Sequence, residues 1–295
     1  IDSTDVTAWD DIEADAGTYI VASSFTAENG SIAIEAAAGN IVSTTVVLKD
    51  ADGDGLGETV TIVASAELDN VNVSARAPVT ADAGTYVVDG MYISETSFVD
   101  VSALAGSVTG TTFESKADYV AVDATDDIIG VTVEAATTAD LVAGIDITGG
   151  SVNALDTVTL DAGGEINGTV VQTDTLADLD AGVDIVGVSV DAATATLDAA
   201  EDIAGGSVST SGDSALTAGV DITGTVVDAD NATLEAGVNI SAVSVNADTD
   251  AVLTALAGHI QGSSVLAGDD ADLAAFLQID STDVTAWDDI EADAG

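Results

Sequence analysis

The stretch LDAGVDIVGVSVDAATAT, residues 179–196, contains the pattern that predicts the fold. A large apolar residue is followed two positions later by a small one three times, as Leu179-x-Ala181, Ile185-x-Gly187 and Val190-x-Ala192. Residues two apart in a β-strand point to the same side. The stretch therefore predicts three short strands, each with one large and one small inward-facing residue.

The same triplet recurs along the chain, and its middle anchor can be followed through every unit. This anchor is Ile1, Ile20, Ile41, Leu68, Val87, Val108, Ile128, Ile147, Ile166, Ile185, Ile203, Ile222, Ile240, Ile260 and Ile279. Apart from the longer step between Ile41 and Leu68, the spacing of these anchors is nearly constant. The sequence thus predicts an internal repeat in which one coil takes about 19 residues.

One such unit cannot bury its own apolar face, but a stack of units can. A helical solenoid would need apolar residues at period 3.6, whereas these stretches have period two. An antiparallel sandwich or barrel is the rival for a period-two pattern, and it does not predict constant three-anchor spacing. The predicted fold class is all-β, a parallel β-solenoid (β-helix) with three short strands per coil.

The first seventeen residues, IDSTDVTAWDDIEADAG, recur without change as residues 279–295. Fourteen anchor steps lead from Ile1 to Ile279, so the second copy re-enters the first in register. We therefore expect a window from a tandem array whose period is residues 1–278. Fourteen coils at about 4.8 Å each would give a rod about 67 Å long per period.

The regularity of the coils divides the chain into three parts of one continuous solenoid. Residues 1–116 are expected to form irregular, longer coils. Residues 117–278 are expected to form regular coils of roughly 18–20 residues each. Residues 279–295 are expected to begin the next tandem period.

The charge balance excludes several classes of partner. The chain has 3 basic and 53 acidic residues, a net charge of −50, so nothing could neutralise the phosphates of a nucleic acid. No apolar run approaches the ~18 residues that span a bilayer, so we expect no direct membrane insertion.

The absence of cysteine excludes thiolate metal sites and cysteine nucleophiles. The three basic residues, Lys49, Arg76 and Lys116, are too few for a phosphate or polysaccharide clamp.

The LxAGxDIxGxxVxA units resemble the repeats of filamentous-haemagglutinin-type and giant repetitive prokaryotic surface proteins. The resemblance is clear over residues 117–289 and looser over residues 1–116. It implies a β-helical fibre, stalk or sheath at the cell surface, and it implies fold and extracellular location better than a particular partner.

The one long step between anchors contains DADGDGLGE, residues 50–58. Carboxylates at loop positions 1, 3, 5 and 9, with glycine at position 6, have the spacing of a calcium loop. The predicted structural Ca²⁺ site takes side-chain oxygens from Asp50, Asp52 and Asp54, the backbone carbonyl of Leu56, and Glu58 directly or through water. The loop resembles the short calcium loops of dockerin and thrombospondin type-3 repeats. A solvated acidic turn is the alternative.

Stacking of the coils predicts two columns of carboxylates. The residue before the middle anchor is acidic in six successive coils, at Asp127, Asp146, Glu165, Asp184, Asp202 and Asp221. A second, broken column follows the Leu anchor at Asp161, Asp180, Asp198 and Glu235. Either column is a divalent-cation or salt-dependent surface, or a solvated edge where Asp favours the bend.

Asn-x-Ser/Thr occurs at Asn29, Asn72, Asn167, Asn231 and Asn239, which makes these residues candidate glycosylation sites. Taken together, the patterns predict a non-enzymatic structural segment of a long extracellular filament, with itself and cations as partners. An adhesin stalk that presents a binding tip encoded elsewhere is the alternative. A non-covalent head-to-tail filament subunit is a third possibility. A β-helical polysaccharide lyase or hydrolase is disfavoured, because the acidic residues of this chain are spread by the repeat and basic residues are nearly absent.

Overall fold

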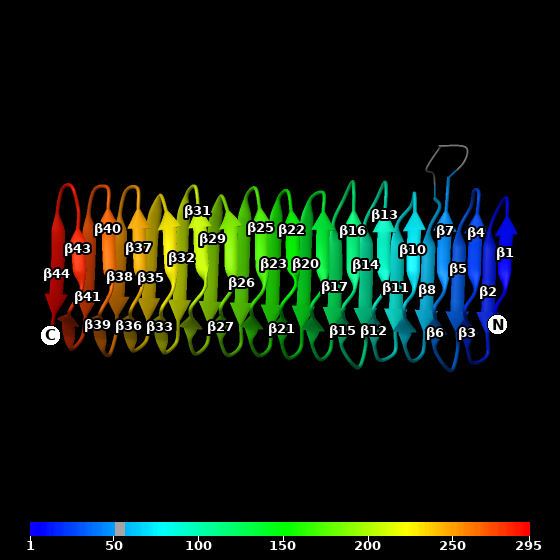
Figure 1. The fold of residues 1–295 in the computed structure, drawn as a ribbon, viewed down its shortest axis with the longest axis horizontal. Coiled ribbons are helices and arrows are strands. Elements are labelled where there is room, and N and C mark those ends of the chain that lie inside the picture. The colour runs from blue at the N-terminus through cyan, green and yellow to red at the C-terminus, as the bar shows by residue number, and fades with distance from the viewer. Residues whose placement is uncertain (51–56) are drawn as a thin grey trace. The chain divides into compact units, whose positions relative to one another are not determined.

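The computed structural model describes residues 1–50 and 57–295, which form 44 β-strands and no helix. Every third strand belongs to the same sheet, and the three parallel sheets form a β-solenoid of about 15 turns with about 19 residues per coil. The predicted all-β parallel solenoid is confirmed. The chain divides into two compact units, residues 1–145 with 150–155, and residues 146–149 with 156–295. Within each unit, successive strands of a sheet lie side by side (Figure 1).

Sheet 1 is the series that begins with β1. In the first unit it contains β1 (Asp5–Ala8), β4 (Ser24–Ala27), β7 (Thr45–Leu48), β10 (Asn72–Ala75), β13 (Met91–Ser94), β16 (Thr112–Ser115), β19 (Thr132–Ala135) and β22 (Ser151–Ala154). In the second unit it contains β25 (Val170–Thr173), β28 (Ser189–Ala192), β31 (Ser207–Thr210), β34 (Val226–Ala229), β37 (Ser244–Ala247), β40 (Ser264–Ala267) and β43 (Asp283–Thr285).

Sheet 2 has the longest strands. In the first unit it contains β2 (Ile12–Ala16), β5 (Ile32–Ala36), β8 (Val60–Ala64), β11 (Val79–Ala83), β14 (Val99–Ala103), β17 (Val120–Ala124) and β20 (Thr138–Ala143). In the second unit it contains β23 (Thr157–Ala162), β26 (Leu176–Ala181), β29 (Thr194–Ala199), β32 (Asp213–Ala218), β35 (Asn231–Ala236), β38 (Ala251–Ala255), β41 (Ala271–Ala275) and β44 (Ile290–Ala294).

Sheet 3 is built from strands of two or three residues. In the first unit it contains β3 (Ile20–Val21), β6 (Ile41–Val42), β9 (Leu68–Asp69), β12 (Val87–Val88), β15 (Val108–Thr109) and β18 (Ile128–Ile129). In the second unit it contains β21 (Ile147–Thr148), β24 (Ile166–Asn167), β27 (Ile185–Val186), β30 (Ile203–Ala204), β33 (Asp221–Thr223), β36 (Asn239–Ser241), β39 (His259–Gln261) and β42 (Gln278–Asp280).

The strands pair in a register that places each anchor residue beside the corresponding anchor of the next coil. In sheet 3 of the second unit, Ile166 pairs with Ile185 and Ile185 with Ile203. In sheet 2, Leu160 pairs with Leu179 in the same way. Identical apolar side chains therefore stack into continuous inward-facing ladders, because a shift of one residue would turn each strand's apolar set toward solvent. These anchors are buried, as the alternation predicts.

The core of the first unit also contains aromatic side chains that take the place of the Val anchor in sheet 1. Phe25, Tyr92 and Phe113 are fully buried, and the rings of Tyr92 and Phe113 stack with centroids 5.7 Å apart. Gly90 makes room for the ring of Tyr92, because a Cβ at Gly90 would lie 2.8 Å from a carbon of that ring. Burial raises the pKa of the Tyr92 hydroxyl above its usual range.

A bend with a left-handed backbone follows sheet 3 in every coil. The residue at this bend has φ between 47° and 66° in all fifteen coils: Ser3, Ala22, Ser43, Asn70, Asp89, Gly110, Gly130, Gly149, Gly168, Gly187, Gly205, Gly224, Ala242, Gly262 and Ser281. Glycine adopts this conformation at no steric cost. The glycine of the Ile-x-Gly pattern is therefore favoured by the backbone that turns the chain from sheet 3 into sheet 1.

Among the described residues there is no helix with the length and apolar character to cross a membrane.

Candidate functional site

The predicted acidic column before sheet 3 is a ladder of hydrogen bonds between successive coils. In the second unit, backbone N–H groups at this position donate to the side chain at the same position of the preceding coil. The bonds run from Glu165 to Asp146 (2.8 Å), Asp202 to Asp184 (2.9 Å), Asp221 to Asp202 (2.9 Å), Asn239 to Asp221 (2.9 Å) and His259 to Asn239 (3.0 Å). We call these five bonds the amide ladder; one joins Glu165 to Asp146, and the other four join the successive coils from Asp184 to His259.

The backbone explains why this position needs an acceptor. Its carbonyl already accepts from the anchor N–H of the preceding coil, as when Ile185 donates to the carbonyl of Asp202 at 2.9 Å. Its own N–H points along the stack at a bend, where a side-chain oxygen from the preceding coil satisfies it. The same solution appears in the first unit, where Glu67 N donates to Asn40 Oδ1 at 3.3 Å and Asp127 N to Ser107 Oγ at 3.2 Å.

The structure thus gives these residues a role that the sequence analysis did not assign. Asp184, Asp202 and Asp221 lie in successive coils, as predicted, and each carboxylate keeps one oxygen in the ladder. The recurrence of Asn and Ser at the same position was the signal, because these side chains share an oxygen acceptor with Asp and carry no charge. Ser107, which carries no charge, accepts the N–H of Asp127 in this way.

The second column, on the outer face of sheet 2, has a different environment. Asp161, Asp180 and Asp198 are paired directly across β23, β26 and β29. Partial burial raises the pKa of the Asp180 carboxyl above its ordinary value, and the carboxylates of Asp161, Asp198 and Asp178 raise it further. We call Asp161, Asp180 and Asp198 the sheet 2 acidic row. The pairing continues from Asp198 to Thr217 and from Thr217 to Glu235, so the predicted break is present.

Asp100 in β14 of the first unit has a similar environment. Burial raises the pKa of its carboxyl, and the neighbouring carboxylates of Asp123 and Asp82 add to the effect. Like charges on adjacent strands of a sheet are therefore a feature of sheet 2 in both units.

The predicted calcium loop begins and ends in residues that the structure describes. Asp50 and Glu58 are both buried, with 4% and 9% of their surface exposed. One Glu58 carboxylate oxygen accepts from the N–H of Gly30 at 2.9 Å, and the other is buried with no hydrogen-bond partner among the residues that the structure describes. A buried carboxylate oxygen with no donor fits a cation as its partner. The other predicted ligands, Asp52, Asp54 and Leu56, lie outside the described residues.

The described residues contain no group of three or more His, Cys, Asp or Glu arranged to hold a metal ion. Asp50 and Glu58 therefore remain two members of a predicted site.

Several candidate glycosylation asparagines use their side-chain nitrogen within the stack. The Nδ2 of Asn231 donates to Asp213 at 2.7 Å, and that of Asn239 donates to Asp221 at 2.9 Å. The Nδ2 of Asn72 donates more weakly to Asn70, at 3.3 Å to its side chain. Because a glycan is attached to this nitrogen, Asn231 and Asn239 would each lose an inter-coil bond on modification. Asn29 follows β4 and Asn167 lies in β24.

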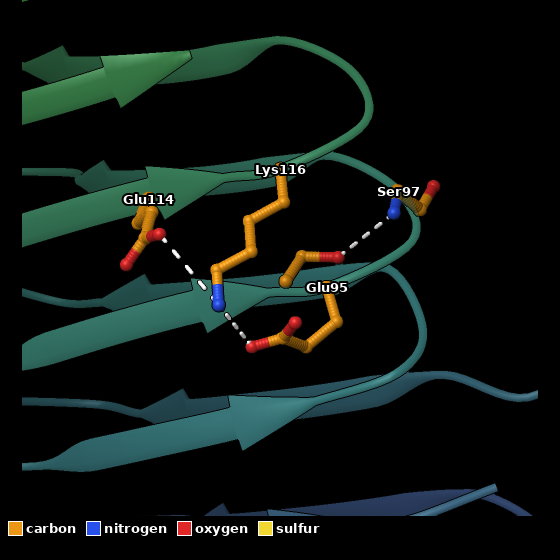
Figure 2. Close-up of polar contacts among 5 residues, drawn as sticks. Glu95, Ser97, Glu114 and Lys116 are labelled. Atoms are coloured by element: carbon orange, nitrogen blue, oxygen red, sulfur yellow. Dashed lines mark hydrogen bonds and ion pairs between the residues drawn. The ribbon is translucent and has the colours of Figure 1, made fainter. Parts of the chain in front are cut away.

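The three basic residues lie at the equivalent bend of three coils, directly after strands β7, β10 and β16 of sheet 1. Lys49 pairs with Glu28 at 2.7 Å. Lys116 lies between two carboxylates, with its Nζ 2.5 Å from Glu95 and 3.8 Å from Glu114 (Figure 2). The nearby turn is held by Ser94, whose Oγ accepts from the N–H of Ser97 at 3.0 Å.

Comparison of the chain with known proteins found no matching family model, no matching curated protein and no matching solved structure.

Proposed function

We propose that this chain is a structural segment of a long extracellular protein fibre, stalk or sheath at the cell surface, built from tandem β-solenoid periods that each correspond to residues 1–278. The role is mechanical, since continuous backbone pairing and an apolar ladder give stiffness to such a fibre.

One observation carries the proposal: the repeated seventeen-residue sequence has parallel partners on both of its sides. In its first copy it pairs forward, as when Ile12 pairs with Ile32 of β5. In its second copy it pairs backward, as when Ile290 pairs with Ala271 of β41. A covalent array gives every copy both partners at once, in the register used by the other coils.

Burial of the same side chain in the two copies supports this inference. Ile12 is 5% exposed beneath the coil that follows it, whereas the identical Ile290 is 52% exposed. In the proposed array, the sequence that follows Gly17 would cover Ile290 as it covers Ile12. This covering would remove the apolar and backbone edge of β44 from solvent.

Charge argues against the alternative in which separate molecules stack end to end. That contact would stack residues 279–295 of one molecule on the identical residues 1–17 of the next. Each acidic residue would then face the same acidic residue of the neighbouring coil, at Asp2, Asp5, Asp10, Asp11, Glu13 and Asp15. The coil that covers residues 1–17 within the chain carries only Glu28 and Glu35. Like charges opposite each other on adjacent strands are destabilising, so the covalent junction is the more favourable of the two.

A chain of two periods, residues 1–278 twice followed by residues 1–17, tests the proposal. We expect particles in electron micrographs to lengthen by about 67 Å per added period. We also expect the backbone amides of the internal copy of residues 290–294 to become protected from hydrogen exchange. Two separate particles joined by a flexible connection, with those amides still exchanging freely, would contradict the proposal.

We further propose that Ca²⁺ binds between Asp50 and Glu58 and fixes the loop there. The support is the buried Glu58 oxygen, which has no hydrogen-bond partner among the described residues. Millimolar Ca²⁺ should then raise the thermal unfolding temperature, and Glu58→Gln should abolish the increase. Glu35→Gln, which removes an equal charge from β5, is the matched control and should retain it. An equal response of both variants, or of Mg²⁺ and Ca²⁺ alike, would indicate general screening of charge.

The adhesin-stalk alternative shares this solenoid and differs in what lies beyond it, so a binding domain in the full polypeptide would favour that alternative.

A further inference from the structure

All three basic side chains of the protein occupy one column, at the bend that follows sheet 1 in the first unit. Backbone N–H groups at this bend donate to the preceding coil: Lys49 to Ala27, Arg76 to Leu48, Glu95 to Ala75 and Lys116 to Ser94, at 2.8–3.1 Å. These bonds place Glu28, Lys49, Arg76, Glu95 and Lys116 in five successive coils. We call these five residues the basic column.

Arg76 is the cation of the basic column that has no ion-pair partner among the described residues. Lys49 and Lys116 are paired with Glu28 and Glu95 of the preceding coils. Arg76 lies between these pairs, is exposed, and forms no ion pair with any described residue. A guanidinium in this position presents five donors to solvent. Its neighbours in the column are Lys49 in the preceding coil and Glu95 in the following coil, and each of these already has its own ion-pair partner.

The second unit has the opposite character, because residues 156–295 contain no Lys or Arg. Its sheet 2 acidic row repeats once per coil, at the spacing of about 4.8 Å that separates adjacent strands. The basic column repeats at the same spacing for the same reason. The two rows therefore share one spacing, and the successive cations Lys49 and Arg76 can face two carboxylates of the acidic row. Glu95, in the coil after Arg76, is already paired with Lys116. The carboxylates of the acidic row repel one another where no cation lies between them.

We propose that the basic column of one molecule binds the sheet 2 acidic row of a second copy of this chain, side by side, with Arg76 against Asp180. The inference rests on the proposed fibre and adds its lateral contact. A second copy is the partner that the charges favour, because its acidic row presents carboxylates at the spacing that separates Lys49 from Arg76.

The salt dependence of this contact has a characteristic shape. Two molecules of charge −50 repel over about 30 Å at 10 mM salt, but over only about 8 Å at 0.15 M. At 1 M the screening length of about 3 Å weakens the ion pairs themselves. Association should therefore be strongest near 0.15 M NaCl and weaker at both extremes, whereas an apolar contact would strengthen steadily with salt.

Sedimentation equilibrium of the chain at these three salt concentrations, up to millimolar protein, tests the proposal. We expect reversible dimers near 0.15 M. Arg76→Gln and Asp180→Asn should each weaken association about tenfold. Arg76→Lys should retain most of it, and Glu235→Gln, the same change of charge outside the row, should have no effect.

A charge exchange makes the test specific to the pair. Arg76→Glu and Asp180→Lys should each abolish self-association, because each places like charges together. An equimolar mixture of the two variants should associate again, since the intact basic column of one meets the intact acidic row of the other. All of these positions are exposed, and circular dichroism checks that the variants remain folded.

A monomer at every salt concentration, association that grows steadily to 1 M, or a mixture that fails to restore binding would each overturn the proposal. So would retention of a sulfated polysaccharide by Arg76 while the protein stays monomeric. A polypeptide of several periods with no lateral association would leave the fibre proposal in place and refute this contact alone.

Discussion

At the scale of single residues, the bend after sheet 3 requires a residue with positive φ. In seven coils this residue is not glycine. Gly187 has φ of 62°, and a Cβ added there would meet no atom within 4 Å. Ala242 has φ of 54° at the same bend. Differences in stability at this position therefore report backbone strain, uncomplicated by packing.

We expect Gly187→Ala to lower the free energy of unfolding by about 1 kcal/mol, because a Cβ disfavours the left-handed region. Ala242→Gly should raise it, by up to about 1 kcal/mol. Urea unfolding of both variants measures the pair. Equal and small effects of the two substitutions would show that the bend is not a source of strain.

The amide ladder gives a second residue-scale prediction. Asp202→Ala leaves the N–H of Asp221 without its acceptor and should cost about 1 kcal/mol of unfolding free energy. Asp202→Asn keeps an oxygen acceptor while removing the charge, so it should be neutral or stabilising at low salt. If the column acts instead as a cation site, both variants should lower stability, and only in the presence of divalent cations.

At the scale of strands, the sheet 2 acidic row concentrates repulsion on three neighbouring elements. The pKa of Asp180 is raised, so the folded state binds a proton more readily than the unfolded chain does. The stability penalty from this group is absent below the unfolded pKa and fully present above the raised folded pKa. Its contribution to stability therefore falls as pH rises through this interval.

We expect Asp180→Asn to stabilise the protein at pH 7 by a few tenths of a kcal/mol, since the site is exposed and screened by solvent. The gain should vanish below the ordinary pKa of an aspartate and in 1 M salt. Glu235→Gln in β35, opposite Thr217 and Thr254, should gain less. A gain for Asp180→Asn that persists at low pH would assign the effect to packing.

The strands were predictable from the sequence because their inward residues recur with fixed spacing. Ile166, Ile185 and Ile203 could be aligned by counting alone, and each of them begins a short strand. The amide ladder was not predictable in this way, because it depends on which N–H a bend leaves without a backbone partner. Nor was the burial of Tyr92, which requires the space left by Gly90 in the same coil.

At the scale of the whole molecule, residues 279–295 repeat residues 1–17, and the fold shows which strands each copy pairs with. The repeat predicts a period, and the pairing of Ile12 and Ile290 on opposite sides shows how one copy could serve both neighbours. The column behind the proposed lateral contact was not apparent from the sequence, because Lys49, Arg76 and Lys116 are unevenly spaced along the chain. Only coils of unequal length bring them into one column.

The intact mass of the native polypeptide under denaturing conditions, with covalent crosslinks excluded, tests the central claim most directly. Several periods in one chain predict a mass of several hundred kilodaltons, about ten or more times that of this segment. A native polypeptide of about the mass of one period would contradict the tandem fibre, and its assembly would then have to be non-covalent.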